Sequence, residues 1–287
     1  MNLIKNYIDG KTTAISSDSI PVNDPSTGEI IAQVVLSNEE DFKIAIESSK
    51  RSQVEWANTT PLRRSRILSN YKNLIELNMQ TLAEMVSKEH GKTIDDAKGS
   101  ITRGLEVVEF ACGIPHLLKG EFSQNVGTNI DSWSIRQPIG VSAGITPFNF
   151  PAMVPMWMYP ISIACGNSFI LKPSEKDPSC SLKLAELFSE AGLPDGVFNV
   201  IQGDKKIVDL ILESPDISSV SFVGSTPVAK YIYEKAAKNL KRVQSLGGAK
   251  NHLVVMPDAN IDQAVDGIIG AGYGSAGERC MAVSVAV

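Results

Sequence analysis

The sequence contains few cysteines, and their spacing excludes several kinds of site. There are four, Cys112, Cys165, Cys180 and Cys280, and they form neither a C-x-x-C pair nor a cluster with histidine. This spacing argues against a zinc centre, an iron–sulfur cluster and a disulfide framework. We therefore expect no metal, and a cytoplasmic protein in a reducing compartment.

The sequence also lacks an excess of positive charge and long apolar runs. Its 287 residues include 27 Lys and Arg against 32 Asp and Glu, a net charge of −5, with no block of five like charges. The longest apolar stretches, residues 161–165 and 253–257, are far shorter than a bilayer span, and the N-terminus has no apolar signal core. We expect no nucleic acid and no membrane as partners, but small molecules and other subunits.

The chain changes character twice along its length. Residues 41–116 are helical in pattern: Ile67, Tyr71 and Ile75 recur at helical spacing after a Thr60-Pro61 start. Residues 121–136 lose this period and predict a protruding polar β-hairpin around an Asn-Val-Gly-Thr-Asn turn. At roughly one domain per 150 residues, the length predicts about two domains.

After Pro138, runs of β-branched residues alternate with amphipathic segments. This βαβ rhythm predicts an α/β fold with an open parallel sheet and flanking helices on both faces. Ligands of such sheets bind beyond the carboxyl ends of the strands. The predicted strands are 141–146, 168–172, 197–202, 219–224, 243–246 and 253–256, and the predicted helices are 153–165, 179–191, 204–213, 226–238 and 261–271.

Two loops that follow predicted strands carry polar side chains. In Thr146-Pro147-Phe148-Asn149-Phe150-Pro151, two prolines stiffen a loop whose asparagine could donate to a developing oxyanion, or could simply satisfy a turn. In Lys172-Pro173-Ser174-Glu175, a cation and a carboxylate could contact a nucleotide phosphate and ribose, or form a surface turn.

Two glycine-containing segments are candidates for a nucleotide-binding loop. Phe222-Val223-Gly224-Ser225-Thr226-Pro227 leads from a strand into a helix, so the helix N-terminus could bind a pyrophosphate; an ordinary capped helix is the alternative. The segment from Gly272 to Gly277 matches G-x-G-x-x-G, but it follows a helix and precedes a strand. Because the dinucleotide fingerprint needs the reverse order, we reject it.

Cys280 is the candidate nucleophile. It lies between a glycine-rich turn and an apolar strand, and the preceding Arg279 could favour its thiolate, although a lone cysteine is usually inert. Cys112, Cys165 and Cys180 lie in helical stretches and fit structural roles. The three histidines, His90, His116 and His252, also fit structural roles.

Taken in order, the segments TPFNFP, LKPSE, GLPDGVFNVIQG, FVGST, LGGAKNH and GERCMA resemble the aldehyde dehydrogenase superfamily over essentially the whole chain. The resemblance implies that Cys280 is the nucleophile and that Asn149 supplies the oxyanion-hole amide. It implies NAD as cofactor, with Lys172 and Glu175 at the adenosine ribose and Ser225 at the pyrophosphate. The implied cofactor-binding set is Thr146, Pro147, Phe148, Lys172, Glu175, Gly224 and Ser225.

Within the superfamily, the chain looks most like the coenzyme A-acylating branch that oxidises methylmalonate and malonate semialdehydes in valine and inositol breakdown. Hydrolytic members carry a glutamate that activates water, whereas counting back from Gly248-Ala249-Lys250 places Leu246 there. Loss of that base favours release of the acyl group to coenzyme A. Arg279 precedes the nucleophile, and in the resembled family the helix of Arg103 borders the substrate tunnel, so the two guanidinium groups could bind the substrate carboxylate. The alternative is that Arg103 pairs with Glu106 or Glu109 on the helix surface, or that Arg279 only braces its loop.

The resemblance also implies a domain plan. Residues 1–120 and 138–250 would form a Rossmann-like NAD-binding domain, residues 121–137 an oligomerisation hairpin, and residues 251–287 the truncated start of a second α/β catalytic domain. We expect an N-terminal part of a longer protein that forms a homo-oligomer, a dimer or homotetramer. The alternatives are a hydrolytic aldehyde dehydrogenase, a non-catalytic nucleotide-binding fragment, and a cysteine acyltransferase or hydrolase without redox chemistry.

Overall fold

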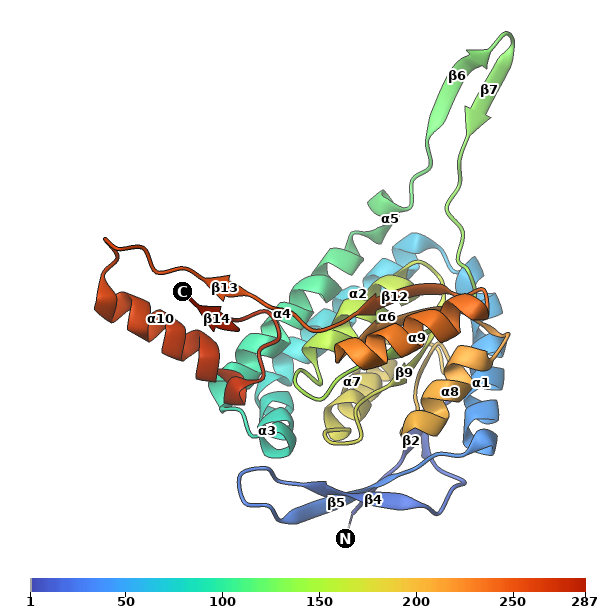
Figure 1. The fold of residues 1–287 in the computed structure, drawn as a ribbon. Coiled ribbons are helices and arrows are strands. Elements are labelled where there is room, and N and C mark those ends of the chain that lie inside the picture. The colour runs from blue at the N-terminus through green and yellow to red at the C-terminus, as the bar shows by residue number, and fades with distance from the viewer. Residues whose placement is uncertain (1) are drawn as a thin grey trace.

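A seven-stranded sheet forms the centre of the computed structural model, which describes residues 2–287 (Figure 1). Five neighbouring strands are parallel, as the βαβ rhythm predicted. At one edge two antiparallel strands join them, so the sheet as a whole is mixed. The strand order is β12 (Arg242–Leu246), β11 (Ile217–Val223), β8 (Val141–Ile145), β9 (Ser168–Lys172), β10 (Phe198–Val200), β2 (Asn6–Ile8) and β3 (Lys11–Thr13).

The central strands are apolar on both sides because helices cover both faces of the sheet. Every residue of β8 and β9 is buried. Along β9, Phe169 and Leu171 pack into one hydrophobic cluster while Ile170 packs into another, as the alternation of side chains along a strand requires. One cluster also involves α2 (Pro61–Leu77), α4 (Ile94–Cys112), α6 (Met153–Ala164) and α7 (Ser179–Glu190), and the other α1 (Glu39–Asn58), α8 (Lys205–Glu213) and α9 (Thr226–Lys238).

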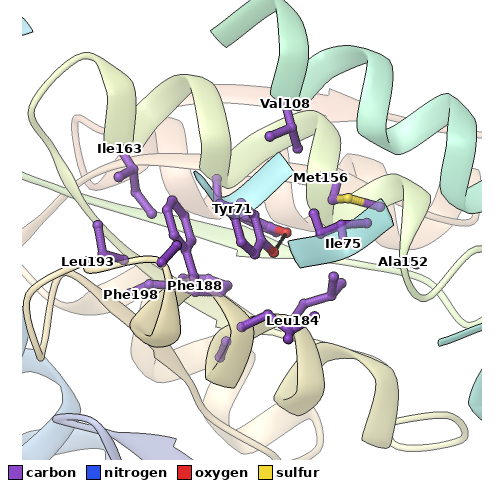
Figure 2. Close-up of a cluster of buried hydrophobic side chains, with 14 of the residues drawn as sticks. Tyr71, Ile75, Val108, Ala152, Met156, Ile163, Leu184, Phe188, Leu193 and Phe198 are labelled. Atoms are coloured by element: carbon purple, nitrogen blue, oxygen red, sulfur yellow. Dashed lines mark hydrogen bonds between the residues drawn. The ribbon is translucent and has the colours of Figure 1, made fainter. Parts of the chain in front are cut away.

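The larger cluster contains a buried aromatic group, drawn in Figure 2. The rings of Tyr71 and Phe188 stack with centroids 4.0 Å apart. The hydroxyls of Tyr71 and Tyr159 lie 2.5 Å apart, so each buried phenol has a polar partner. Tyr71 comes from α2, whose first turn follows the predicted Thr60 cap, where the side chain accepts from the Arg63 N–H.

Several strands near the N-terminus were not predicted from the sequence. Besides β2 and β3, a separate three-stranded sheet forms from residues before 36. These strands are two to six residues long. The separate sheet has the order β1 (Leu3–Ile4), β5 (Ile30–Val35) and β4 (Ser19–Asn23).

The predicted hairpin is present and extends away from the body of the molecule (Figure 1). It consists of β6 (Phe122–Gly127) and β7 (Ile130–Trp133), and it follows α3 (Met79–His90), α4 and α5 (Ile114–Leu117) in the chain. The side chains of Phe122 and Trp133 are exposed. A role in oligomerisation stays a prediction.

The C-terminal segment lies to one side of the main sheet (Figure 1). It contains β13 (His252–Leu253), α10 (Ile261–Tyr273), a 3₁₀ turn at Ser275–Gly277 and β14 (Val285–Ala286). The predicted strand 253–256 was wrong in extent, because only Leu253 of those residues is in a strand, paired in parallel with β14. The G-x-G-x-x-G segment begins in the last turn of α10 and precedes β14, so its order is helix then strand, as predicted, and the reverse of the dinucleotide fingerprint.

No helix within residues 2–287 combines the length and apolar character needed to cross a membrane.

Candidate active site

The register of the sheet places four loops together at the carboxyl ends of its parallel strands. Ile145 lies opposite Lys172 on one side and Phe222 on the other, and Val223 lies opposite Leu246. Since these strands are parallel, the loops that leave them start at the same level. The candidate residues on these four loops therefore lie at the carboxyl end of the parallel strands, where such sheets bind ligands.

Asn149 is buried in the loop after β8 and is held at both its side chain and its main chain. Its Nδ2 donates to the Glu278 carbonyl oxygen at 2.7 Å, and its own carbonyl oxygen accepts from Lys92 Nζ at 2.6 Å. The contact with Glu278 lies two residues from Cys280. An amide nitrogen has two N–H donors, so one can stabilise charge on a substrate oxygen.

A cavity of about 250 Å³ contains the nucleophile candidate and its predicted partners. Its lining includes Asn149, Ser225, Leu246 and Cys280. Cys280 is partly buried against the apolar cluster of Phe150, Met153 and Val154, and its carbonyl oxygen accepts from Asn251 Nδ2 at 3.3 Å. Pro147, Phe148 and Gly224 line the same cavity. The structure thus unites residues that are up to 133 positions apart (280 − 147).

The loop between β11 and α9 presents a helix N-terminus to this cavity. Ser225 is the N-cap residue of α9, yet within the described part of the chain its side chain makes no capping hydrogen bond. This observation disfavours the alternative of an ordinary side-chain cap. The hydroxyl and the first N–H groups of α9 can bind an anion such as a pyrophosphate.

Lys172 and Glu175 form an ion pair on the loop after β9. Lys172 is buried, and its Nζ lies 2.8 Å from Glu175 Oε2. Burial alone would raise the pKa of Glu175, but the Lys172 charge and hydrogen bond hold that pKa below its usual value. The carboxylate therefore stays ionised and can accept from ribose hydroxyls. Thr146 donates its backbone N–H to the Lys172 carbonyl, which joins this loop to that of Asn149.

Leu246 is the residue predicted to replace the general base of hydrolytic relatives, and that correspondence stays a prediction. It ends β12 and lines the cavity with Cys280. An aliphatic side chain cannot take a proton from water, so Leu246 cannot act as a general base beside the thiol.

Arg103 and Arg279 line a second cavity of about 280 Å³, together with Phe150, Met153 and Ser275. Each also has a carboxylate partner: Arg279 Nη2 lies 2.5 Å from Asp96 Oδ1, and Arg103 Nε lies 3.8 Å from Glu106 Oε2. The two guanidinium groups therefore share a cavity, and the predicted role in binding a substrate carboxylate stays a prediction.

Sequence reasoning missed Lys92 and Asp96, which contact the site from the α3–α4 connection. The available signals were a Gly-Lys pair at the end of a helix and an acidic residue in the first turn of the next. Neither is distinctive. Among residues 2–287, no group of three or more His, Cys, Asp or Glu side chains could hold a metal ion.

Comparison with known proteins decides the family. The model of the aldehyde dehydrogenase family matches residues 12–287. The chain belongs to this family. A malonate-semialdehyde dehydrogenase from Pseudomonas aeruginosa is 56% identical over 287 residues, covering 100% of this chain and 58% of that protein. Another from Halalkalibacterium halodurans is 50% identical over 99% of this chain and 59% of its own length.

Solved structures of aldehyde dehydrogenases agree in fold. A protein from Sinorhizobium meliloti 1021, assigned as a methylmalonate-semialdehyde dehydrogenase and solved with NAD, superposes with a TM-score of 0.98 at 58% identity, covering 100% of this chain and 58% of that one. The methylmalonate-semialdehyde dehydrogenase of Oceanimonas doudoroffii gives a TM-score of 0.97 at 53% identity, covering 100% and 59%. The chain therefore spans a little under three fifths of these relatives.

Proposed function

We propose that this chain supplies the nucleotide-binding part and the nucleophile of an NAD-dependent, coenzyme A-acylating methylmalonate- or malonate-semialdehyde dehydrogenase. The observation that carries the proposal is the shared cavity of Cys280, Asn149, Ser225 and Leu246. It combines a thiol, an oxyanion donor and an anion-binding helix end, with leucine where a hydrolytic enzyme needs a base.

The residues present fit NAD. The unused side chain of the Ser225 cap and the N-terminus of α9 suit the pyrophosphate. The ionised Glu175 beside Lys172 suits the adenosine ribose, and it would repel a 2′-phosphate. When bound, NAD supplies the hydride acceptor.

The chain's own groups perform the remaining steps. The Cys280 thiolate adds to the aldehyde carbonyl, and the negative charge on oxygen is stabilised by the Asn149 amide and the Cys280 backbone N–H. After oxidation, the acyl group is a thioester on Cys280 with a carboxylate β to its carbonyl. Loss of carbon dioxide leaves the bonding electrons on the α-carbon, which takes a proton. The coenzyme A thiol then displaces Cys280 and carries the acyl group away.

The test uses the protein isolated at its natural length, supplied with malonate semialdehyde and NAD, with and without coenzyme A. We expect NADH and acetyl-coenzyme A, no turnover in Cys280→Ser, and retained nucleotide binding in that variant, because its cofactor contacts lie elsewhere. Free acid as the main product in the presence of coenzyme A would instead indicate the hydrolytic reaction. Nucleotide binding without turnover would indicate a non-catalytic module.

Two further assignments belong to the same proposal. The protruding hairpin of β6 and β7 would pair subunits of a homo-oligomer, since it carries exposed Phe122, Ile130 and Trp133. Residues 251–287 would begin the catalytic domain, since α10 has no buried residue in this structure. Sedimentation of the protein with Trp133→Ser tests the first assignment, and an unchanged oligomeric state would refute it.

A further inference from the structure

The segment from Gly91 to Asp96, which comprises the α3–α4 connection and the first turn of α4, contacts both reacting parts of the candidate site. Gly91 ends α3 with φ at 87°, a left-handed conformation that favours glycine. The chain then turns inward, so Lys92 is almost fully buried, with 2% of its surface exposed. Helix α4 starts after the Thr93 cap, which places Asp96 in its first turn.

Lys92 fixes the main chain that carries Asn149. Its Nζ donates to the Asn149 carbonyl oxygen at 2.6 Å and lies 4.0 Å from the centroid of the Phe150 ring. Burial lowers the pKa of Lys92 to about 8, although the charges of Asp177 and Asp96 act in the opposite direction. The ammonium is therefore held between the main chain and the aromatic face of one loop.

Asp96 fixes the turn that precedes Cys280. Its Oδ2 accepts from the Ser275 backbone N–H at 2.9 Å, and its Oδ1 accepts from Arg279 Nη2 at 2.5 Å. Burial alone would raise the pKa of Asp96, but these two donors hold the pKa below its usual value. One ionised carboxylate thus bridges both ends of the turn.

The turn itself needs such support. Ser275, Ala276 and Gly277 have φ values of 55°, 55° and 76°, which are unfavourable for the two that carry a Cβ. Strained backbone persists where the surrounding structure over-determines it. Gly274 contributes by its lack of a side chain, because a Cβ there would lie 2.7 Å from Arg279 Cζ. The rejected G-x-G-x-x-G segment therefore has a structural reason for one of its glycines.

We propose that Lys92 and Asp96 are positioning residues for the reacting groups: Lys92 sets the place of the Asn149 amide, and Asp96 sets the place of the Cys280 thiol. Because both residues come from one helix start, a single rigid element fixes the two groups relative to each other. The 2.7 Å contact of Asn149 with the Glu278 carbonyl joins the two parts. This inference rests on the proposed function for its catalytic consequence, but not for its geometry.

The first test measures the turn without relying on turnover. Asp96→Asn keeps the size of the side chain but turns one oxygen into a donor that faces Arg279. We expect alkylation of Cys280 by iodoacetamide, followed by peptide mass spectrometry with Cys165 as internal reference, to be at least ~5-fold faster because the turn opens. Asp262→Asn, which removes the same charge from the first turn of α10, is the control. An alkylation rate equal to wild type in Asp96→Asn would overturn the assignment.

The second test concerns Lys92. Lys92→Met keeps much of the buried volume while removing the donor to Asn149, and Lys88→Met, at an exposed position on α3, is the control. We expect faster amide hydrogen exchange at Phe148, Asn149 and Phe150, the residues between the two prolines, and a kcat lower by on the order of 10- to 100-fold with KM for NAD unchanged. Equal effects on kcat and on KM for NAD, or unchanged exchange, would mean that Lys92 serves only general stability.

The two proposals fail in different ways. If wild-type protein does not oxidise an aldehyde but Asp96→Asn still opens the turn, the proposed function is wrong and the positioning role stands. If wild-type protein is active and Asp96→Asn changes neither kcat nor alkylation of Cys280, the positioning role is wrong and the proposed function stands.

Discussion

The two arginines of the second cavity give the sharpest prediction about substrate charge. Each substitution, Arg103→Leu or Arg279→Leu, should lower kcat/KM for malonate semialdehyde more than for propionaldehyde, which has no carboxylate. A hydrogen bond to a charged group contributes about 1.5–3 kcal/mol, which corresponds to roughly a 10- to 150-fold change in rate.

The structure predicts a smaller loss for Arg103→Leu than for Arg279→Leu. The Arg103 side chain is 72% exposed and lies 3.8 Å from its nearest carboxylate, so solvent screens its charge and the loss should be near 10-fold. Arg279 is 40% exposed and is oriented by Asp96, which uses only one of its five N–H donors. Because solvent screens the Arg279 charge less, Arg279→Leu should lower kcat/KM for malonate semialdehyde by closer to 150-fold, about the upper limit.

The comparison of substrates is needed because Arg279 also holds the turn before Cys280. Its removal should slow both substrates through the misplaced thiol, whereas loss of a carboxylate contact affects only the charged one. The informative quantity is therefore the ratio of kcat/KM for the two aldehydes, measured by NADH formation in the protein at its natural length. A ratio that does not change in either variant would refute carboxylate binding and leave both arginines as structural residues.

Three further predictions concern the cofactor, the acyl group and stability. Glu175→Gln should reduce the preference for NAD over NADP, because the charge that repels a 2′-phosphate is gone; an unchanged kcat/KM ratio would contradict this. Leu246→Glu should increase release of free acid when coenzyme A is omitted, by placing a base near the thioester, and product analysis checks it. Burial and the Lys92 charge lower the pKa of His90 from 6.5 to about 4. Between these two pH values the imidazole is protonated in the unfolded chain but neutral in the folded protein. The free energy of unfolding should therefore fall as pH drops through that range, and His90→Asn should weaken the fall between about pH 7 and about pH 5 in urea denaturation; an equal decline in both proteins would contradict this.

Much of the sheet could be predicted because burial on both faces leaves a strong sequence pattern. Strand β9 was predicted with its observed bounds, Ser168–Lys172, since every one of its residues is buried between two helical layers. The short strands β2 and β3 could not be predicted in the same way. Strand β3 has no buried residue, and β2 joins the main sheet by pairing with β10, where Tyr7 lies opposite Val200. The hairpin of β2 and β3 did carry a local signal, the Asp9-Gly10 turn with positive φ at both residues.

The candidate site could be predicted where polar residues lie at the ends of parallel strands. Asn149 and Ser225 follow parallel strands of the main sheet and Lys172 ends another, so the βαβ pattern alone places them at the carboxyl end of these strands. Lys92 follows a helix and Asp96 lies in the first turn of the next helix, so neither follows a strand, and their partners lie 57 and at least 179 positions away. Local pattern contains no information about such contacts.

The proposed cofactor loops and the proposed nucleophile differ in the contacts that hold them in place. The loops after β8 and β9 leave strands that are buried throughout, and β11 is buried at Ile217, Val220 and Phe222. Cys280 instead follows α10, which has no buried residue, and a strained turn whose main anchors are Asp96, Asn149 and Asn251. Local stability decreases where buried apolar contacts are few, so the position of the thiol depends on those polar contacts far more than the position of the cofactor loops does. For this reason a substitution distant from Cys280 in sequence, such as Asp96→Asn, should affect the reactivity of the thiol while leaving the cofactor contacts in place.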